Sequence, residues 1–167
     1  MKKMTKKALY DAFSGESMAH MKYLIFSQMA EKEGYRNVAR LFKAIAFAEQ
    51  VHATNHAINL EMIKETKDNL YSAMEGEIFE VNEMYPAYSA IAKMQEEKEA
   101  QTSFYYALEA EKIHAELYQK ARQAVENGND IQIDEIYICP ICGYTHVGIP
   151  PDRCPVCGAE KEKFEKF

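Results

Sequence analysis

The chain has 167 residues, with 26 acidic and 20 basic side chains and a formal net charge of −6 at pH 7. This acidic surplus argues against a general nucleic-acid binder, because phosphate contacts require a basic face. No apolar run reaches the roughly 18 residues of a membrane span. Asp11 and Glu16 interrupt the segment after the basic start, so no secretory leader is expected either. We expect a cytoplasmic protein that binds neither membrane nor nucleic acid.

Good helix formers dominate the segment 1–127, and apolar residues recur there at helical spacing. Segment 70–126 is too long for one helix of a compact domain, so we expect a break near 95–97, although no glycine marks it. Pro86 lacks an amide donor and should kink this segment. Four long amphipathic helices predict a four-helix bundle. The predicted helices cover 5–34, 36–63 and the two parts of 70–126, with a polar loop over 64–69.

The frequency of glycine and proline changes sharply near residue 127. Segment 1–127 contains three glycines and one proline, whereas segment 128–167 contains four of each and all four cysteines. A composition shift of this kind marks a domain boundary. We predict a helical domain over 1–127, a linker over 128–134 and a small cysteine-containing domain over 135–167, with strands at Ile131–Ile133 and Ile136–Ile138 before the first cysteine pair.

An internal repeat relates the two halves of the helical region. Gly15-Glu16 matches Gly76-Glu77 at an offset of 61 in the numbering, and Glu49-x-x-His52 matches Glu111-x-x-His114 at an offset of 62. A single Glu-x-x-His is more often a solvated pair on a helix surface than a metal site. Two copies in register with two Gly-Glu pairs reverse that preference, so we interpret the repeat as functional.

Five carboxylates fall within the apolar stripes of the predicted helices. On the helical period, for example, Glu16 lies among Phe13, Ala19 and Tyr23. Buried carboxylates repel one another and take up protons unless cations neutralise them. No lysine or arginine shares the centres of these stripes, so metal ions are the simplest explanation. The five are Glu16, Glu49, Glu77, Glu80 and Glu111.

The donor set narrows the choice of metal. Carboxylates with one or two imidazoles suit iron or manganese, whereas structural zinc prefers thiolates and histidines. A Glu from each of two helices, with Glu-x-x-His from each of the other two, is the ligand pattern of di-iron carboxylate proteins with a ferritin-like bundle. The sequence therefore predicts a di-iron centre in the helical region.

The tail contains two copies of Cys-Pro-x-Cys-Gly with eleven residues between the pairs. Two residues between thiolates let one turn present both sulfurs to a single ion. Four thiolates favour tetrahedral iron or zinc, and the motif alone does not distinguish these metals. Disulfide pairing is the weakest alternative in a cytoplasmic chain. The predicted ligands are Cys139, Cys142, Cys154 and Cys157.

With these motifs combined, the chain resembles the rubrerythrin family over essentially its whole length. The resemblance rests on Gly15-Glu16, the two Glu-x-x-His motifs, Gly76-Glu77-x-x-Glu80 followed by Met84-Tyr85-Pro86, and the two cysteine pairs. Glu80 is an extra carboxylate, because the matching position of the first half is Ala19. The missing glycine near residue 95 is a small departure from the family's pattern.

The resemblance implies a ferritin-like di-iron bundle joined to a rubredoxin-like domain. Such a protein would be a non-haem peroxidase that reduces hydrogen peroxide to water and protects anaerobes from oxidative stress. Its cofactors would be two irons in the helical site and one iron, or zinc, in the four-cysteine site. An electron-donor protein, either rubredoxin or an NAD(P)H-dependent reductase, would supply electrons to the four-cysteine site in the tail. Because the linker is flexible, we expect electron transfer between subunits of a homodimer or higher homo-oligomer.

The resemblance also implies a set of fixed ligands. Glu49 and Glu111 would bridge the two irons, with Glu16 and Glu80 as terminal carboxylates. His114 would bind one of the irons.

Other residues would take changing or indirect roles. His52 and Glu77 would exchange as ligands of the second iron between the reduced and oxidised states. Tyr23 and Tyr85 match tyrosines that line the family's site.

Two other function classes stay open on the residues. A ferroxidase or iron-handling protein would use the helical site but gain little from the four-cysteine tail. A non-enzymatic peroxide or metal sensor could combine a structural bundle with a zinc tail.

The predicted metal site also accounts for most of the acidic surplus. Of the 26 acidic side chains, the five carboxylates named above belong to that site, and those that remain nearly balance the 20 basic ones. Net charge is therefore weaker evidence about partners than its value suggests.

Overall fold

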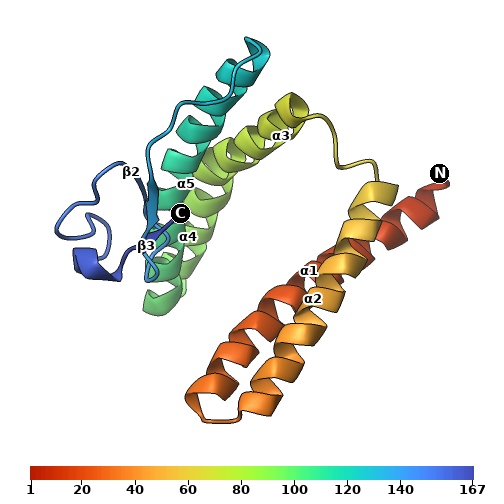
Figure 1. Ribbon diagram of the computed structural model, residues 1–167, viewed down its shortest axis with the longest axis horizontal. Helices are drawn as coiled ribbons and strands as arrows, with labels where there is room; N and C mark the ends of the chain where they lie inside the picture. The colour runs from red at the N-terminus through yellow and green to blue at the C-terminus, as the bar shows by residue number, and fades with distance from the viewer. The chain divides into compact units, whose positions relative to one another are not determined.

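The computed structural model describes the whole chain from Met1 to Phe167. It divides the chain into two compact units, Met1–Lys64 and Glu65–Phe167, which are described one at a time (Figure 1). Both units are built from long helices, and the second also carries a small sheet near the C-terminus. None of the helices is long and apolar enough to cross a membrane. The predicted class, helical with a small β- and turn-rich region, is confirmed.

The first unit is a hairpin of α1 (Lys3–Lys32) and α2 (Arg36–Asn59). Small side chains line its seam, so the two backbones approach closely, and two polar groups reach across it. His20 Nδ1 lies 2.7 Å from the carbonyl oxygen of Ala46, and Ser27 Oγ donates to another α2 carbonyl at 2.9 Å. The buried alanines of this unit are Ala30, Ala39, Ala46, Ala53 and Ala57.

The second helix is shorter than the sequence pattern predicted. It ends at Asn59 rather than at Ile63, because Glu61 takes a left-handed φ of 58°. The N–H of Met62 then donates to the carbonyl of Ala57 at 3.0 Å, which closes the helix end. Apolar spacing did not reveal this ending, since apolar residues continue beyond it.

The second unit begins with α3 (Thr66–Phe79), which continues through the π-helical segment η1 (Glu80–Met84) into α4 (Tyr85–Met94). The last helix of the unit is α5 (Lys98–Glu126), which packs against all three segments. The loop predicted over 64–69 was therefore too long. Its polar residues from Thr66 onward form the first turn of α3, where the acidic Asp68 favours a helix N-terminus.

The segment η1 explains a detail of the repeat. The offset between the halves is 61 at Gly76 and 62 at His114, so the second half has one additional residue between these points. A π turn reaches back five residues, as the N–H of Tyr85 does to the carbonyl of Glu80, and thereby absorbs one extra residue. We expected an irregularity at Pro86, and the structure has this π turn just before it. Pro86 itself lacks a backbone N–H and cannot donate a hydrogen bond.

The turn between α4 and α5 confirms the predicted break near 95–97. Glu96 takes a φ of 59° there, and the N–H of Glu97 donates to the carbonyl of Ala92 at 2.9 Å. The repeat equivalent of Glu96 in the first unit is Gly34, which has a φ of 86°. The left-handed conformation suits glycine but costs about 1–2 kcal/mol for a residue with a Cβ. The second turn therefore carries a backbone strain that the first one avoids.

The C-terminal region contains a three-stranded antiparallel sheet in the order β2-β1-β3. Its strands are β1 (Ile136–Ile138), β2 (Thr145–Val147) and β3 (Glu165–Lys166), and the short 3-10 helix η2 (Lys161–Lys163) precedes β3. The strand predicted at 131–133 is not formed. Both edges of β1 are already paired, and no other strand pairs with 131–133 to provide hydrogen bonds.

This small domain packs on α5 within the second unit (Figure 1). Its core consists of three buried cysteines and one alanine, and Tyr106 of α5 packs against that core. Strand β2 also contacts α5. The four-cysteine region is thus seated on a helix of its own chain. The buried core residues are Cys139, Cys142, Cys154 and Ala159.

Replacing Glu96 by glycine should increase the free energy of unfolding by about 0.5–1 kcal/mol, because it removes the left-handed strain. Urea unfolding followed by circular dichroism measures this change. Gln95→Gly is the matched control: Gln95 has a φ of −92°, so glycine there only increases the freedom of the unfolded chain and should destabilise. A similar effect of both substitutions would contradict the assignment of strain to Glu96.

Candidate metal centres

The first helical unit brings three predicted ligands together. Glu16 of α1 and both Glu49 and His52 of α2 each place one ligand atom within 4.8 Å of the others. Residues three apart lie on one face of a helix, and His52 Nδ1 is accordingly 3.0 Å from Glu49 Oε2. The Glu49 side chain is only 16% exposed, whereas that of His52 is 53% exposed.

The second unit repeats this arrangement. Glu77 of α3 and both Glu111 and His114 of α5 also have ligand atoms within 4.8 Å of one another. His114 Nδ1 lies 2.5 Å from Glu111 Oε2, and the His114 side chain is 30% exposed. Glu80, the first residue of η1, is not one of these three, but its charge acts on Glu77. Each unit thus carries two clustered carboxylates and one imidazole.

Burial of the carboxylates of the second unit, and repulsion among them, raise their pKa values. Burial, then the charge of Glu111 and a hydrogen bond with it, raises the pKa of Glu77 from 4.5 to about 7. Burial and the charge of Glu111 also raise the pKa of Glu80. Without a cation, Glu77 therefore retains a proton close to neutral pH. A divalent metal would remove this electrostatic penalty, so the donor set fits a metal site.

The two predicted tyrosines differ in their surroundings. Burial and the charges of the nearby carboxylates, that of Glu80 foremost, raise the pKa of Tyr85. The phenol of Tyr85 therefore stays protonated and can donate a hydrogen bond beside the carboxylates. Tyr23 packs against Phe26 and Phe42, with ring centroids 6.2 and 6.1 Å away. The place of Tyr23 at the metal site stays a prediction.

The four cysteines form a second candidate centre. Their sulfur atoms lie within 4.8 Å of one another, with 3.5 Å between Cys139 Sγ and Cys157 Sγ and 3.5 Å between Cys142 Sγ and Cys154 Sγ. A tetrahedral ion with bonds of about 2.3 Å separates its sulfurs by about 3.8 Å, whereas a disulfide requires about 2.05 Å. All four cysteines are free. Their geometry fits a tetrathiolate metal site.

Two glycines shape the turns that present these sulfurs. Gly143 and Gly158 have φ values of 78° and 77°, which favour residues without a Cβ. Their N–H groups donate to the carbonyls of Cys139 and Cys154 at 2.9 Å in both turns. The left-handed backbone conformation therefore explains why a glycine follows each cysteine pair in the sequence.

The thiols are not equally easy to ionise. Burial acts to raise the pKa of Cys139, but hydrogen bonds from the backbone amides of Ile141 and Cys142 bring it below its usual value. Burial raises the pKa of Cys142 and of Cys157. Thiolates are the metal-binding form of cysteine, so a bound cation is required to hold all four deprotonated at neutral pH.

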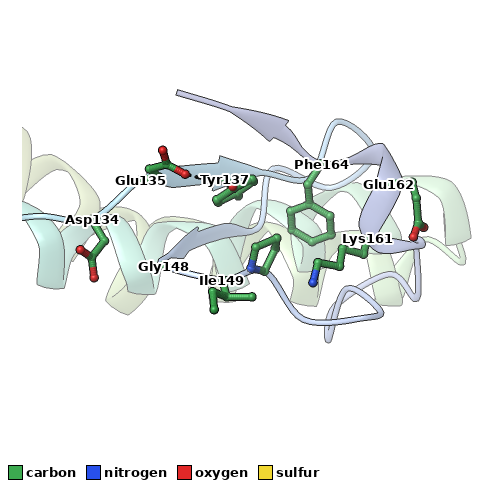
Figure 2. A pocket seen from close by; sticks show the side chains of 9 residues that line it. Asp134, Glu135, Tyr137, Gly148, Ile149, Lys161, Glu162 and Phe164 are labelled. Atoms are coloured by element: carbon green, nitrogen blue, oxygen red, sulfur yellow. Dashed lines mark hydrogen bonds between the residues drawn. The ribbon is translucent and has the colours of Figure 1, made fainter.

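A separate hollow of about 540 Å³ lies on the surface of the C-terminal domain (Figure 2). Tyr137 on its wall donates from its hydroxyl to Glu135 Oε2 at 3.2 Å, and Lys161 and Phe164 line the same hollow. None of the candidate metal ligands lines it. The hollow is therefore not part of either metal centre.

These donor sets define a class: helical proteins with a di-iron carboxylate site and a rubredoxin-type four-cysteine site. Residues 7–122 match the family model described as rubrerythrin, and residues 137–165 match the model of the rubrerythrin rubredoxin-like domain. The chain belongs to the rubrerythrin family. It carries the Glu and His residues of the di-iron centre and the four cysteines of the rubredoxin-type iron centre. The predicted linker at 128–134 falls between the two matched ranges.

Named relatives cover almost the whole chain. Rubrerythrin-2 of Clostridium acetobutylicum is 45% identical, over 98% of this chain and 97% of its own length. Nigerythrin of Nitratidesulfovibrio vulgaris is 35% identical, over 98% of this chain and 86% of its own. A solved structure of fully reduced, all-ferrous nigerythrin matches with a TM-score of 0.57 and 34% identity, over 98% of this chain and 86% of that one.

Two polar contacts beside the candidate ligands were missed by the sequence interpretation. His20 bridges α1 and α2 through the carbonyl of Ala46. Thr145 Oγ1 lies 2.7 Å from His114 Nε2, although the two residues are far apart in the sequence. The spacing of four residues between Glu16 and His20 allowed a position beside the site, but a surface histidine was favoured. Thr145 belongs to no motif, so spacing gave no signal for it. The π segment, in contrast, had a signal in the change of the repeat offset from 61 to 62.

Removing the metal from the four-cysteine site should unfold the C-terminal domain, because its buried core is almost entirely cysteine. We expect amides of β1 and β2 to lose protection from hydrogen exchange when the chain is refolded with excess chelator, and to regain it when metal is restored. Amides of α1 and α2 report metal loss from the carboxylate site separately, because these helices contain Glu16, Glu49 and His52 but no cysteine. Protected β1 and β2 amides in metal-free protein would contradict this prediction.

Proposed function

We propose that this chain is a non-haem di-iron peroxidase that reduces hydrogen peroxide to water. The supporting observation is the pair of repeat-related ligand clusters, each with two carboxylates and one histidine within 4.8 Å, together with a four-cysteine site seated on α5. Family membership supports an oxidoreductase of the di-iron type. The peroxidase reaction itself is the step that we propose beyond this.

The ligands of both clusters would belong to the di-iron centre in this proposal, because a di-iron carboxylate centre takes its ligands from four helices. Glu49 and Glu111 would bridge the irons, Glu16 and Glu80 would be terminal ligands, and His114 would be a fixed ligand.

Two residues would exchange as ligands of the second iron. His52 would bind it in the reduced state and Glu77 in the oxidised state. The pKa of Glu77, about 7 in metal-free protein, supports a carboxylate that alternates between holding a proton and binding metal. The 53% exposure of the His52 side chain within its unit supports an imidazole that can move.

Bound iron supplies the two electrons that convert hydrogen peroxide and two protons into two water molecules. The protein residues position the substrate and move protons. Glu77 can release a proton near neutral pH from a carboxyl group beside Glu111. Tyr85 stays protonated and can donate a hydrogen bond from its hydroxyl. Tyr23, on the first unit, lines the same site in this proposal.

The tetrathiolate centre would relay electrons to the carboxylate site. An electron-donor protein, rubredoxin or an NAD(P)H-dependent reductase, would reduce that centre. We propose a homodimer or higher homo-oligomer as the active form. Four free thiols grouped for metal binding support a reducing, cytoplasmic location. The predicted division into a bundle (1–127), a linker (128–134) and a rubredoxin-like domain (135–167) belongs to this proposal.

The decisive experiment combines metal analysis, a visible spectrum and peroxide-driven reoxidation of the reduced protein. Three irons per chain, thiolate-to-iron absorption and rapid reoxidation by hydrogen peroxide are the expected results. Reoxidation by oxygen with iron release, but without rapid peroxide consumption, would indicate an iron-handling protein instead. A colourless protein with zinc in the tail would indicate a sensor.

Glu77→Ala should slow peroxide turnover by roughly 10²-fold, because it removes the group that holds and releases a proton. Iron content of the carboxylate site should stay near two, since His52 remains as an alternative ligand. Stopped-flow reoxidation of the reduced protein measures the rate. Glu75→Ala is the matched control, because Glu75 is an exposed carboxylate on the same helix. An unchanged rate in Glu77→Ala would remove Glu77 from the mechanism.

Cys142→Ser should abolish turnover that is driven by an external reductase, whereas the carboxylate site should still bind its metal when metal is supplied in excess. The chemically reduced variant should still consume one equivalent of peroxide per di-iron site in a single turnover. Multiple-turnover and single-turnover assays on the same sample separate these two steps. Full reductase-driven turnover in Cys142→Ser would contradict the role of the tail.

A further inference from the structure

Thr145 is a buried hydroxyl that connects the four-cysteine domain to the carboxylate cluster. Its residue is only 4% exposed, and no other polar residue of the chain is buried as deeply. It belongs to β2, yet its Oγ1 lies 2.7 Å from Nε2 of His114 on α5. Both residues lie in the second unit, so this contact is part of one compact structure.

Metal binding through Nδ1 sets the direction of this contact. A metal-bound Nδ1 carries no proton, so the ring proton of His114 is then on Nε2. Thr145 Oγ1 accepts from Nε2 at 2.7 Å and donates its single proton to the carbonyl of Gly143 at 3.2 Å. Nδ1 lies 2.5 Å from Glu111 Oε2, so these two ligand atoms can share one cation.

The repeat provides an internal comparison. His52 occupies the equivalent position of the first unit and also places Nδ1 beside its glutamate. Within that unit, Nε2 of His52 has no hydrogen-bond partner, and its side chain is 53% exposed against 30% for His114. The two Glu-x-x-His motifs are alike in sequence, but only the histidine of the second motif has a hydrogen-bond partner at Nε2.

The hydrogen bond between Thr145 and His114 depends on the position of the turn that contains Cys139 and Cys142. Its acceptor, Gly143, directly follows Cys142 and donates to the carbonyl of Cys139 at 2.9 Å. The same glycine sits so near α5 that a Cβ added to it would be 3.9 Å from Ala110 Cβ. The Thr145 hydroxyl can therefore reach His114 only while the cysteine turn is seated on the helix.

We propose that Thr145 is a positioning residue for His114. It fixes the ring so that Nδ1 serves as the metal-binding atom, and it makes this orientation depend on the docked four-cysteine domain. Partners that hold the second nitrogen of a metal-binding histidine set its tautomer and strengthen metal binding. The proposal rests on the proposed function only in taking His114 as a ligand of the carboxylate site.

The first test uses the wild-type protein loaded with Zn(II), a diamagnetic probe that fills both sites. In nitrogen-15 NMR, His114 should show a proton on Nε2 that exchanges slowly with water, assigned by its loss in His114→Gln. His52 should show no slowly exchanging ring proton. A His114 ring protonated on Nδ1, or a rapidly exchanging Nε2 proton, would overturn the proposal without any threonine variant.

The second test compares Zn(II) affinity at the carboxylate site by chelator competition. Thr145→Val keeps the shape and strand preference but removes the hydroxyl, and should weaken binding by about 10-fold or more. Thr145→Ser should restore wild-type affinity. Thr102→Val removes an exposed hydroxyl of α5 that bonds only its own helix, and should have no effect.

Zinc bound by the four cysteines is measured in the same samples and should stay unchanged in Thr145→Val. Wild-type affinity in Thr145→Val would overturn the proposal. Neither test measures peroxide turnover, so a protein that lacks peroxidase activity can still show the His114 signature. Conversely, full peroxidase activity in a protein whose His114 Nε2 proton exchanges rapidly would reject only the role of Thr145.

Discussion

Mutual repulsion of closely spaced carboxylates is the constraint on which the helical region depends. Each hairpin places two glutamates and a histidine within 4.8 Å, an arrangement that is unfavourable for ionised side chains without a cation. The effect is explicit at Glu77, which burial and its neighbour Glu111 keep protonated up to a pH of about 7. Metal binding converts the same cluster from a destabilising element into a stabilising one, because the cation compensates all the carboxylates at once.

The two halves of the repeat differ at the candidate site. The second half has the carboxylate Glu80 at the position of Ala19, and the π turn that starts there absorbs the one extra residue. π turns of this kind are frequent at functional sites because they redirect side chains within a helix. The second unit therefore carries the denser negative charge and the better supported histidine. The first unit carries the more exposed histidine, His52.

Patterns of period and spacing predicted most of the fold and most of the candidate ligands. The helices, the break near Glu96 and the ligand groups follow from apolar periodicity and from motifs that local geometry keeps together. The helix end near Glu61 and the unpaired segment 131–133 were mispredicted, because backbone dihedrals and strand partners are not encoded in apolar spacing. Thr145 could not be predicted at all. Its role depends on how the tail sits on α5, a long-range contact that no local pattern specifies.

The same long-range contact makes the carboxylate cluster of the second unit structurally dependent on the four-cysteine centre. The small domain has few buried side chains other than cysteines, so its fold depends on the metal that the cysteines bind. Its seat on α5 in turn depends on the turn at Gly143, which the cysteine pair shapes. Thr145 extends from that turn to the nitrogen of His114 that faces away from Glu111. A loss of metal from the tail would therefore change the orientation of the His114 ring in the carboxylate cluster. This effect does not depend on electron transfer.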